Sequence, residues 1–318
     1  MTIPPPRRPS PGDEPDVLVA VVTYNSARIV DRFLAALPGA LAGAGTASVV
    51  VVDNASQDGT ADLVRSLAPW VVVVETGANL GYAAGINRAL AHARPRRGAY
   101  VLNPDAVPSP GSVDLLARAV EAHVRLGIAV PRIVGADGRL KASLRREPTI
   151  ARALGEALLG GHRAGRFAAL GEVVTDPARY VDGAQADWAT GAAMFLARRT
   201  IDAVGSWSEE YFLYSEETDF ALRVRDAGLE LRLVAAAEVV HPGGEQATSP
   251  WLWSLATVNR TRLYRSRHGR ASSTVFLGAV LLNECLRARR PTSREAARAL
   301  VRGVRPPTDL RPVPATAG

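Results

Sequence analysis

Two acidic clusters in this sequence have residue types and spacing suited to chemistry. The first, Asn103-Pro104-Asp105, ends an apolar run over residues 99–102. A carboxylate is a suitable ligand for a hard divalent cation, and a proline restricts the backbone just before it. The second cluster, residues 216–219, precedes an apolar helical pattern, so its acids crowd a helix N-terminus. Carboxylates in such a position are suited to general acid–base chemistry.

The elements that must position these acids follow from hydrophobic patterning. Short continuous apolar runs predict buried parallel strands over residues 17–22, 48–52, 70–74 and 99–102. Helical patterns lie between them, over residues 27–41, 60–67 and 83–93. This alternation predicts an α/β fold with a doubly wound, mostly parallel sheet. Ligands of such sheets bind beyond the carboxyl ends of the strands.

Polar residues follow each predicted strand, at the edge where a ligand would bind. They are, strand by strand, Thr23, Tyr24 and Asn25; Asp53; Asn79 and Gly81; and Asn103 with Asp105. Asn25 is also suited to a helix cap and Gly81 to a turn. Asp53 follows four valines, so its carboxylate must be hydrogen-bonded or face the crevice. The G-x-G-x-x-G fingerprint of dinucleotide-binding folds is absent, because the first strand is followed by TYNSAR.

Composition and charge bound the class of protein. The chain has 318 residues, 47% of them hydrophobic, and a net charge of +7, which is ordinary for a globular protein. The lone cysteine, Cys285, fits a reducing compartment, and we expect it to be buried. Arginines gather after residue 251, which suits an anionic membrane surface, a diphosphate, nucleic acid or a solvated helix face.

The two ends of the chain and its longest late apolar run also carry expectations. Residues 1–15 are rich in proline and polar residues, so we expect a disordered leader and no signal peptide. We expect a disordered tail over residues 301–318. The apolar run over residues 275–282 is too short to span a bilayer. The protein is therefore expected to be soluble or peripheral.

Seven motifs together resemble the inverting glycosyltransferases of family 2, which have the GT-A fold. They are VVTYNS (21–26), VVVDNASQDGT (50–60), NLGYAAGINRAL (79–90), LNPDA (102–106), TGAAMFLARR (190–199), FLYSEETDFALRVRDAG (212–228) and VVHPGG (239–244). They span residues 17–245 in the family's order. The pattern looks most like bacterial rhamnosyltransferases that act on a polyprenyl-diphosphate-linked sugar.

This resemblance implies a donor site that is shared by the strand ends. It assigns Thr23, Tyr24, Asn25 and Asp53 to the nucleotide base, and Asn79, Gly81 and Asn87 to the nucleoside and diphosphate. Asn103 and Asp105 occupy the place of the family's D-x-D motif, with the first carboxylate replaced. Asp105 and His241 are the implied ligands of a Mg²⁺ or Mn²⁺ ion.

The resemblance also implies the residues of the chemical step. It assigns the base to Glu217, with Glu216 and Asp219 holding the acceptor or neighbouring basic groups; the choice between Glu216 and Glu217 is less secure than the cluster. The donor sugar and acceptor would be lined by residues of two segments, namely Trp188, Thr190, Gly191 and Arg145. Trp188 also suits a core position, and Arg145 a surface charge.

The implied reaction is transfer of L-rhamnose from dTDP-rhamnose, with inversion, to a polyprenyl-diphosphate-linked saccharide in cell-wall or polysaccharide biosynthesis. UDP-galactofuranose or another UDP-hexose is the alternative donor. A sugar nucleotidyltransferase and a non-catalytic sugar-nucleotide-binding protein are the alternative classes. The enzyme would be cytoplasmic, with peripheral attachment to the inner face of the cell membrane as a hypothesis. No nucleic-acid partner is expected, and the oligomeric state is left open.

The expected domain organisation follows from the extent of the motifs and from the late arginines. A GT-A domain is expected over residues 16–250, followed by an Arg-rich helical extension over residues 251–300. We expect the arginines of this extension to dock the enzyme on an anionic membrane surface.

Overall fold

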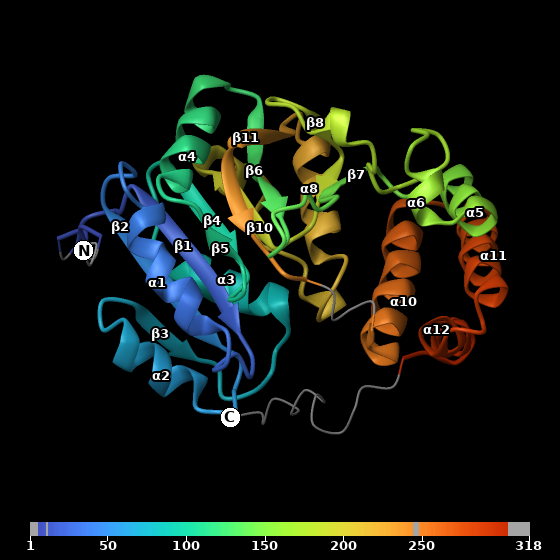
Figure 1. Ribbon diagram of the computed structural model, residues 1–318, viewed down its shortest axis with the longest axis horizontal. Coiled ribbons are helices and arrows are strands. Elements are labelled where there is room, and N and C mark those ends of the chain that lie inside the picture. The colour runs from blue at the N-terminus through green and yellow to red at the C-terminus, as the bar shows by residue number, and fades with distance from the viewer. Residues whose placement is uncertain (1–5, 11, 244–247, 305–318) are drawn as a thin grey trace.

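One mixed sheet forms the centre of the computed structural model, which describes residues 6–10, 12–243 and 248–304 (Figure 1). Its strand order is β3-β2-β1-β4-β10-β6-β11-β5, with β8 paired to β11. The strands are β1 (Val17–Thr23), β2 (Ala47–Asp53), β3 (Val72–Glu75), β4 (Gly98–Leu102), β5 (Val107–Pro108), β6 (Leu126–Val134), β8 (Gln185–Ala186), β10 (Ala193–Ala197) and β11 (Glu230–Val240). Parts of the expected leader and tail, residues 1–5, 11 and 305–318, lie outside the described residues.

The first four strands are parallel, as predicted, so their carboxyl ends share one edge. β1 pairs with β2 and β4, and β2 pairs with β3, all in parallel register. The register places Thr23 opposite Asp53. The α/β prediction is therefore confirmed, and polar residues that follow different strands come together at this edge.

Helices cover both faces of the sheet because alternate residues of β1 point to opposite sides. Val17, Val19 and Val21 belong to a buried cluster with residues of α1 (Val30–Ala40), α2 (Thr60–Leu67) and α4 (Ser112–Ala122). Leu18 and Ala20 belong to a second cluster with α3 (Tyr82–His92) and α8 (Glu216–Asp226). α8, which carries the second acidic cluster, is thus fixed by packing on the same face as α3.

The first helix begins at Val30, three residues later than the pattern predicted. The Ala27 N–H donates to Asp58 Oδ2 at 3.0 Å, and the Ser26 N–H donates to Thr60 Oγ1 at 2.8 Å. These bonds tie the chain after β1 to the loop after β2 before the helix starts.

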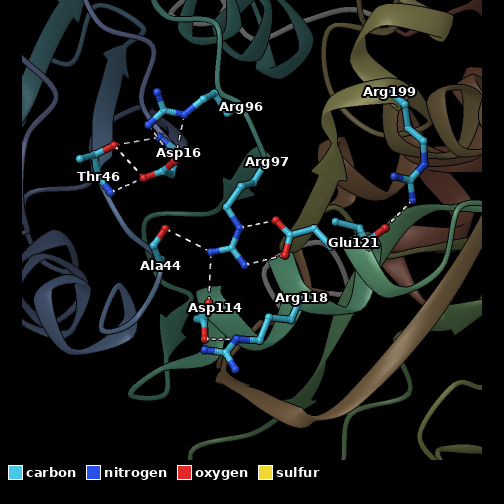
Figure 2. Close-up of polar contacts among 10 residues, drawn as sticks. Asp16, Ala44, Thr46, Arg96, Arg97, Asp114, Arg118, Glu121 and Arg199 are labelled. Atoms are coloured by element: carbon cyan, nitrogen blue, oxygen red, sulfur yellow. Dashed lines mark hydrogen bonds and ion pairs between the residues drawn. The ribbon is translucent and has the colours of Figure 1, made fainter.

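The opposite edge of the sheet, at the amino ends of β1, β2 and β4, is closed by a network of charged side chains (Figure 2). Asp16 Oδ2 accepts a 2.8 Å hydrogen bond from the Thr46 N–H. Chiefly because of this bond, the pKa of the Asp16 carboxyl lies below its usual value. Arg97 donates to both carboxylate oxygens of Glu121 and to Asp114 at 3.1 Å. Charged side chains thus hold the amino ends of these strands together.

The predicted helical C-terminal extension is confirmed, and a helix from earlier in the chain, α5, packs against it. It contains α10 (Pro250–Arg267), α11 (Arg270–Leu286) and α12 (Pro291–Arg302). α11 packs against α5 (Ile150–Leu159), which is followed by α6 (Gly161–Ala164), at the end of the molecule far from β3 (Figure 1). Phe276 is fully buried between these helices.

The prediction that Cys285 is buried is wrong, because this cysteine is exposed. It follows the buried Phe276 by about two and a half helical turns, which places the two side chains on opposite sides of α11. Within the described residues, no helix combines the length and the hydrophobicity needed to cross a bilayer.

Candidate functional site

Asp53 lies at the centre of the loops that follow β1 and β2. Its Oδ1 accepts from Thr23 Oγ1 at 2.8 Å and from Ser56 Oγ at 2.6 Å, and its Oδ2 accepts from the Ser56 N–H at 2.8 Å. The residue is only 1% exposed. Asp53 therefore organises both loops, and its contact with a nucleotide base stays a prediction. Ser56, which lies inside one of the sequence motifs, was not singled out from the sequence.

Asn25 links the same two loops on their exposed side. Its backbone has a φ of +50°, in the left-handed region. Its N–H donates to Ser56 Oγ at 2.8 Å, and its Oδ1 accepts from the Gln57 N–H at 2.8 Å. Asn25 is exposed and its neighbour Tyr24 is half-buried. The two loops are thus joined at the end of β1, and their role as a donor site stays a prediction.

Gly81 is required by a close approach between two segments. Its φ is +89°, and an added Cβ would lie 2.4 Å from the carbonyl oxygen of Phe212. That oxygen accepts a 2.7 Å hydrogen bond from the Tyr82 N–H. Asn79 Oδ1 accepts from the Gly81 N–H at 3.2 Å, and Asn54 Nδ2 donates to the Gly81 carbonyl at 2.9 Å. Gly81 and Asn79 therefore join the donor loops to the segment that leads into α8.

The side-chain amide of Asn87 forms hydrogen bonds within the protein. Its Nδ2 donates to the Trp207 carbonyl at 3.0 Å and to Glu209 Oε1 at 2.8 Å, and its Oδ1 accepts from the Trp207 N–H at 2.8 Å. These bonds fix the chain ahead of α8. The structure does not bring the Asn87 amide to the surface formed by Asn25 and Asp53, so its nucleotide contact stays a prediction.

The two predicted metal ligands lie next to each other. Asp105 Oδ1, after β4, and His241 Nε2, after β11, are 3.2 Å apart. Two donor atoms at adjacent corners of an octahedral Mg²⁺ shell lie about 3.0 Å apart, so this oxygen and nitrogen fit one edge of such a shell. No group of three carboxylate, imidazole or thiol side chains suited to a metal occurs in the described part of the chain. Asp105 and His241 leave further positions of such a shell open to donors such as diphosphate oxygens and water.

Asn103 shapes the turn that carries Asp105. Its N–H donates to the Ala192 carbonyl at 2.9 Å, and its own carbonyl accepts from the Ala106 N–H at 3.1 Å. The abrupt end of β4 is thus a tight turn, and it is fastened to the segment before β10.

Glu216 and Glu217 form a pair of acids at the start of α8. Glu216 is 3% exposed and Glu217 is half-buried. The Oε2 atom of each lacks a hydrogen-bond partner among the described residues. Burial raises the pKa of both carboxyl groups, and the charge of Glu217 raises the pKa of Glu216 further. Unpartnered buried carboxylate oxygens with raised pKa values are typical of catalytic acids and bases.

The hydroxyl of Tyr82 senses the charges of this pair and of Asp105. Burial raises the pKa of its hydroxyl well above the usual value, and the charges of Glu216, Glu217 and Asp105 raise it further. The hydroxyl donates to the Gly191 carbonyl at 3.1 Å. An added Cβ on Gly191 would lie 3.3 Å from Glu217 Cβ. Gly191 therefore lies between Tyr82 and Glu217. The sequence reasoning gave Tyr82 no role, although it adjoins Gly81.

Asp219 is not brought into this group. Its Oδ2 accepts a 2.8 Å hydrogen bond from Arg223 Nε, and Arg223 also donates to the Val204 carbonyl at 3.0 Å. Two residues along a helix separate side chains by about 200°, so Asp219 and Glu217 project from different sides of α8. Asp219 anchors the chain that precedes the helix, and its contact with the acceptor stays a prediction.

Arg145 and Trp188 pair across a small second sheet made of β7 (Leu144–Arg145) and β9 (Trp188–Ala189). Trp188 is 9% exposed, and its Nε1 donates to the Arg146 carbonyl at 3.0 Å. Trp188 therefore occupies a core position, which was one of the two expectations for this residue. The Arg145 guanidinium lies over the Trp188 ring, 5.7 Å from its centroid. Burial lowers the pKa of Arg145, while the charges of nearby acids, Glu217 among them, oppose this change. Arg145 is therefore a partly buried cation that acts on Glu217, and the expectation of a surface charge does not apply.

Thr190 lies between the small sheet and Gly191. It is half-buried, and its N–H donates to the Ser143 carbonyl at 3.1 Å. This bond fixes the strand that presents Gly191 to Glu217, whereas contact of Thr190 with a sugar stays a prediction.

The loop before α8 is strained, and a residue of the helical extension holds it. Positive φ angles, rare for residues with side chains, occur at Phe212, Tyr214 and Ser215. Asn259 of α10 is 1% exposed, and its Nδ2 donates at 2.7, 3.0 and 3.2 Å to the carbonyl oxygens of Tyr211, Leu213 and Tyr214. The sequence reasoning missed Asn259, because nothing near it in the sequence distinguishes it.

Comparisons of the sequence with known proteins give related enzymes. Residues 18–173 match the family model described as glycosyl transferase family 2. The N-acetylglucosaminyl-diphospho-decaprenol L-rhamnosyltransferase of Mycobacterium tuberculosis is 34% identical over 239 residues, which cover 71% of this chain and 76% of that protein. The low-salt glycan biosynthesis hexosyltransferase Agl10 of Haloferax volcanii is 22% identical over 234 residues, which cover 71% and 67%.

The fold has a counterpart among solved structures. The mannosyltransferase PcManGT from Pyrobaculum calidifontis, in complex with GDP-Man and Mn²⁺, superposes with a TM-score of 0.54 at 19% identity, covering 94% of this chain and 79% of that one. The sheet, the helices on its two faces and this likeness confirm the predicted GT-A fold. Together with the identity to the mycobacterial enzyme, they show that the chain belongs to glycosyltransferase family 2 and is rhamnosyltransferase-like.

Proposed function

We propose that this glycosyltransferase transfers L-rhamnose from dTDP-rhamnose to a polyprenyl-diphosphate-linked saccharide, with inversion, in cell-wall or polysaccharide biosynthesis. The observation that carries the proposal is the buried pair Glu216 and Glu217, each with one unpartnered carboxylate oxygen, together with the adjacent Asp105 and His241. The choice of donor and acceptor is supported by the 34% identity to an enzyme named for transfer of L-rhamnose to a decaprenol-linked sugar.

The donor would lie across the carboxyl ends of β1, β2 and β4. The loops held by Asp53 and Asn25 would take the nucleoside, and the diphosphate would reach the turn at Asp105. Asp105 and His241 would hold a divalent cation, which when bound supplies positive charge to the departing diphosphate. Arg145 adds a positive charge that acts on Glu217.

Glu217 is the better base of the pair. Glu216 is deeper, and its pKa is raised by the charge of Glu217, whereas the charge of Arg145 lowers the pKa of Glu217. Glu217 therefore ionises first. Its carboxylate takes the proton of the acceptor hydroxyl while the hydroxyl oxygen bonds to the anomeric carbon, and the electron pair of the broken bond leaves with the nucleoside diphosphate. Attack from the face opposite the leaving group gives inversion in one step.

A donor panel tests this proposal. Thermal stabilisation is measured with dTDP-rhamnose, UDP-galactofuranose, UDP-glucose, UDP-N-acetylglucosamine and GDP-mannose, each with and without Mg²⁺ or Mn²⁺. We expect the largest metal-dependent stabilisation with dTDP-rhamnose. Stabilisation by the guanosine donor alone would refute the rhamnosyl assignment. Product analysis separates the classes, because transfer releases a nucleoside diphosphate, nucleotidyl transfer releases pyrophosphate, and a binding protein releases neither.

Asn259 should act as a positioning residue in this enzyme. Asn259→Ala removes the side-chain donor that three carbonyls of the strained loop share, so we expect a loss of about 1–3 kcal/mol in stability. Because Glu217 follows this loop directly, kcat should fall by roughly 10²-fold, while the Kd for the donor changes little. Rates are measured at a temperature where circular dichroism shows the variant folded.

Arg265→Ala, at an exposed position on the same helix, is the matched control. A folded Asn259→Ala enzyme with the wild-type kcat would show that the amide does not position the base.

A further inference from the structure

The helices α5 and α11 expose large apolar side chains. On α5, Leu154 is 37% and Leu158 is 70% exposed; on α11, Val275 is 54%, Leu282 is 39% and Leu286 is 58% exposed. Residues four apart on α5, and seven and eleven apart on α11, share one face of a helix. Each helix therefore has an exposed apolar stripe in addition to its buried one.

The two stripes belong to neighbouring helices that run in the same direction. Arg287, at the end of α11, donates to the carbonyl oxygens of Glu156 and Ala157, near the end of α5, at 2.9 and 3.0 Å. Earlier along both helices, Ala153 packs in one buried cluster with Phe276. Figure 1 shows this helix pair side by side at the end of the molecule.

Basic residues follow both helices where they end together. Arg163 and Arg166 come after α5, Arg289 and Arg290 come after α11, and all four are exposed. The acids within residues 150–170 and 270–290 are Glu156 and Glu284. Glu156 forms a 2.9 Å ion pair with Arg260, and Glu284 is 2% exposed. The outward surface of the helix pair thus combines apolar and cationic groups, with its acids turned inward.

By contrast, two arginines of α10 form ion pairs within the protein. Arg260 also pairs with Glu172 at 2.5 Å, and Arg267 pairs with Asp226 at 2.5 Å. Arg260 and Arg267 of α10 are therefore engaged within the protein, whereas the four arginines that follow α5 and α11 are exposed.

We propose that the exposed face of α5 and α11, with Arg163, Arg166, Arg289 and Arg290 at its end, docks onto an anionic lipid bilayer. Apolar side chains on an amphipathic surface enter the boundary between headgroups and acyl chains, and arginines beside them attract anionic headgroups. The inference deepens the proposed function and rests on it for its purpose, since it brings the enzyme to the surface that would carry a lipid-linked acceptor.

Sedimentation of the full chain with vesicles tests the proposal. The vesicles contain phosphatidylcholine alone or with phosphatidylglycerol. We expect binding to the anionic vesicles, weaker binding at high salt, and little binding to phosphatidylcholine alone. The variant Leu158→Gln/Leu286→Gln should lose most of this binding, and Arg163→Gln/Arg166→Gln should lose about fivefold for each arginine removed. Val124→Gln, at a residue 79% exposed away from this face, is the control and should bind like the wild type.

Two outcomes would overturn the proposal. One is unchanged vesicle binding by the Leu158→Gln/Leu286→Gln variant. The other is a wild-type dimer, seen by analytical ultracentrifugation and lost in that variant, with no vesicle binding, which would show that a second copy covers the face. Donor stabilisation is measured on the same samples without vesicles. Its loss would count against the proposed function, whereas its retention without vesicle binding would count against docking alone.

Discussion

Glu217→Gln should lower kcat by about 10²- to 10⁴-fold, the usual contribution of a general base, while the Kd for the nucleotide sugar stays close to the wild-type value. Glutamine fills the same space beside Gly191 and Tyr82 but cannot accept the acceptor's proton. Initial rates of nucleoside diphosphate release give kcat, and donor-dependent thermal stabilisation gives binding. Wild-type turnover in this variant would remove Glu217 from the mechanism.

The pH profile provides an independent reading of the same residue. A base must be ionised to act, and burial raises the pKa of Glu217 above the ordinary glutamate value. At a given acidic pH a smaller fraction of Glu217 is ionised, so turnover should begin to fall at a higher pH than an ordinary glutamate would give. This acid limb should be present in the wild type and absent from the residual activity of Glu217→Gln.

Glu216→Gln is the matched control, because it makes the same change one residue earlier in the same helix. We expect it to keep the acid limb and to lose less activity, since Glu216 is the deeper acid with the more strongly raised pKa. A larger loss in Glu216→Gln than in Glu217→Gln would exchange the two roles.

The parts of the fold that sequence reasoning predicted are those determined by local pattern. Runs of buried valines predicted β1 and β2, and the polar residues after them predicted the edge where the loops meet. The adjacency of Asp105 and His241 was also predicted, although only through resemblance to a family, because no pattern near either residue indicates the other.

The parts that were missed depend on contacts between distant segments. Tyr82 matters because it bonds to Gly191 and senses the charges of three acids, and Asn259 because it reaches a loop in which residues with side chains adopt positive φ. Tyr82 lies inside a motif that does not reveal these contacts, and no local signal marks Asn259. Asn87 is the opposite case, because it lies within a strong sequence motif and yet does not join the loops at the strand ends. It bonds to the backbone of Trp207 and so supports the site from a distance.

Asp105→Asn should abolish metal-dependent turnover, with a loss of at least about 10²-fold in kcat/KM. Asp105 supplies the negative charge of the proposed metal pair, because His241 binds a metal as the neutral imidazole and residue 103 is Asn. The amide keeps the shape of the turn but offers a divalent cation a neutral oxygen, so the Mn²⁺ concentration needed for half-maximal donor stabilisation should rise. The measurement is a Mn²⁺ titration of activity and of donor-dependent melting temperature.

Asn103→Asp tests the same charge argument in the opposite direction. The Asn103 N–H and carbonyl fasten the turn through the backbone, so a change of side chain leaves both bonds possible. A second carboxylate at this turn restores the spacing of the family's D-x-D motif, and we expect activity to be kept and half-saturation to occur at a lower Mn²⁺ concentration. Full activity in Asp105→Asn would refute metal binding by this turn, because turnover would then not need the negative charge of Asp105.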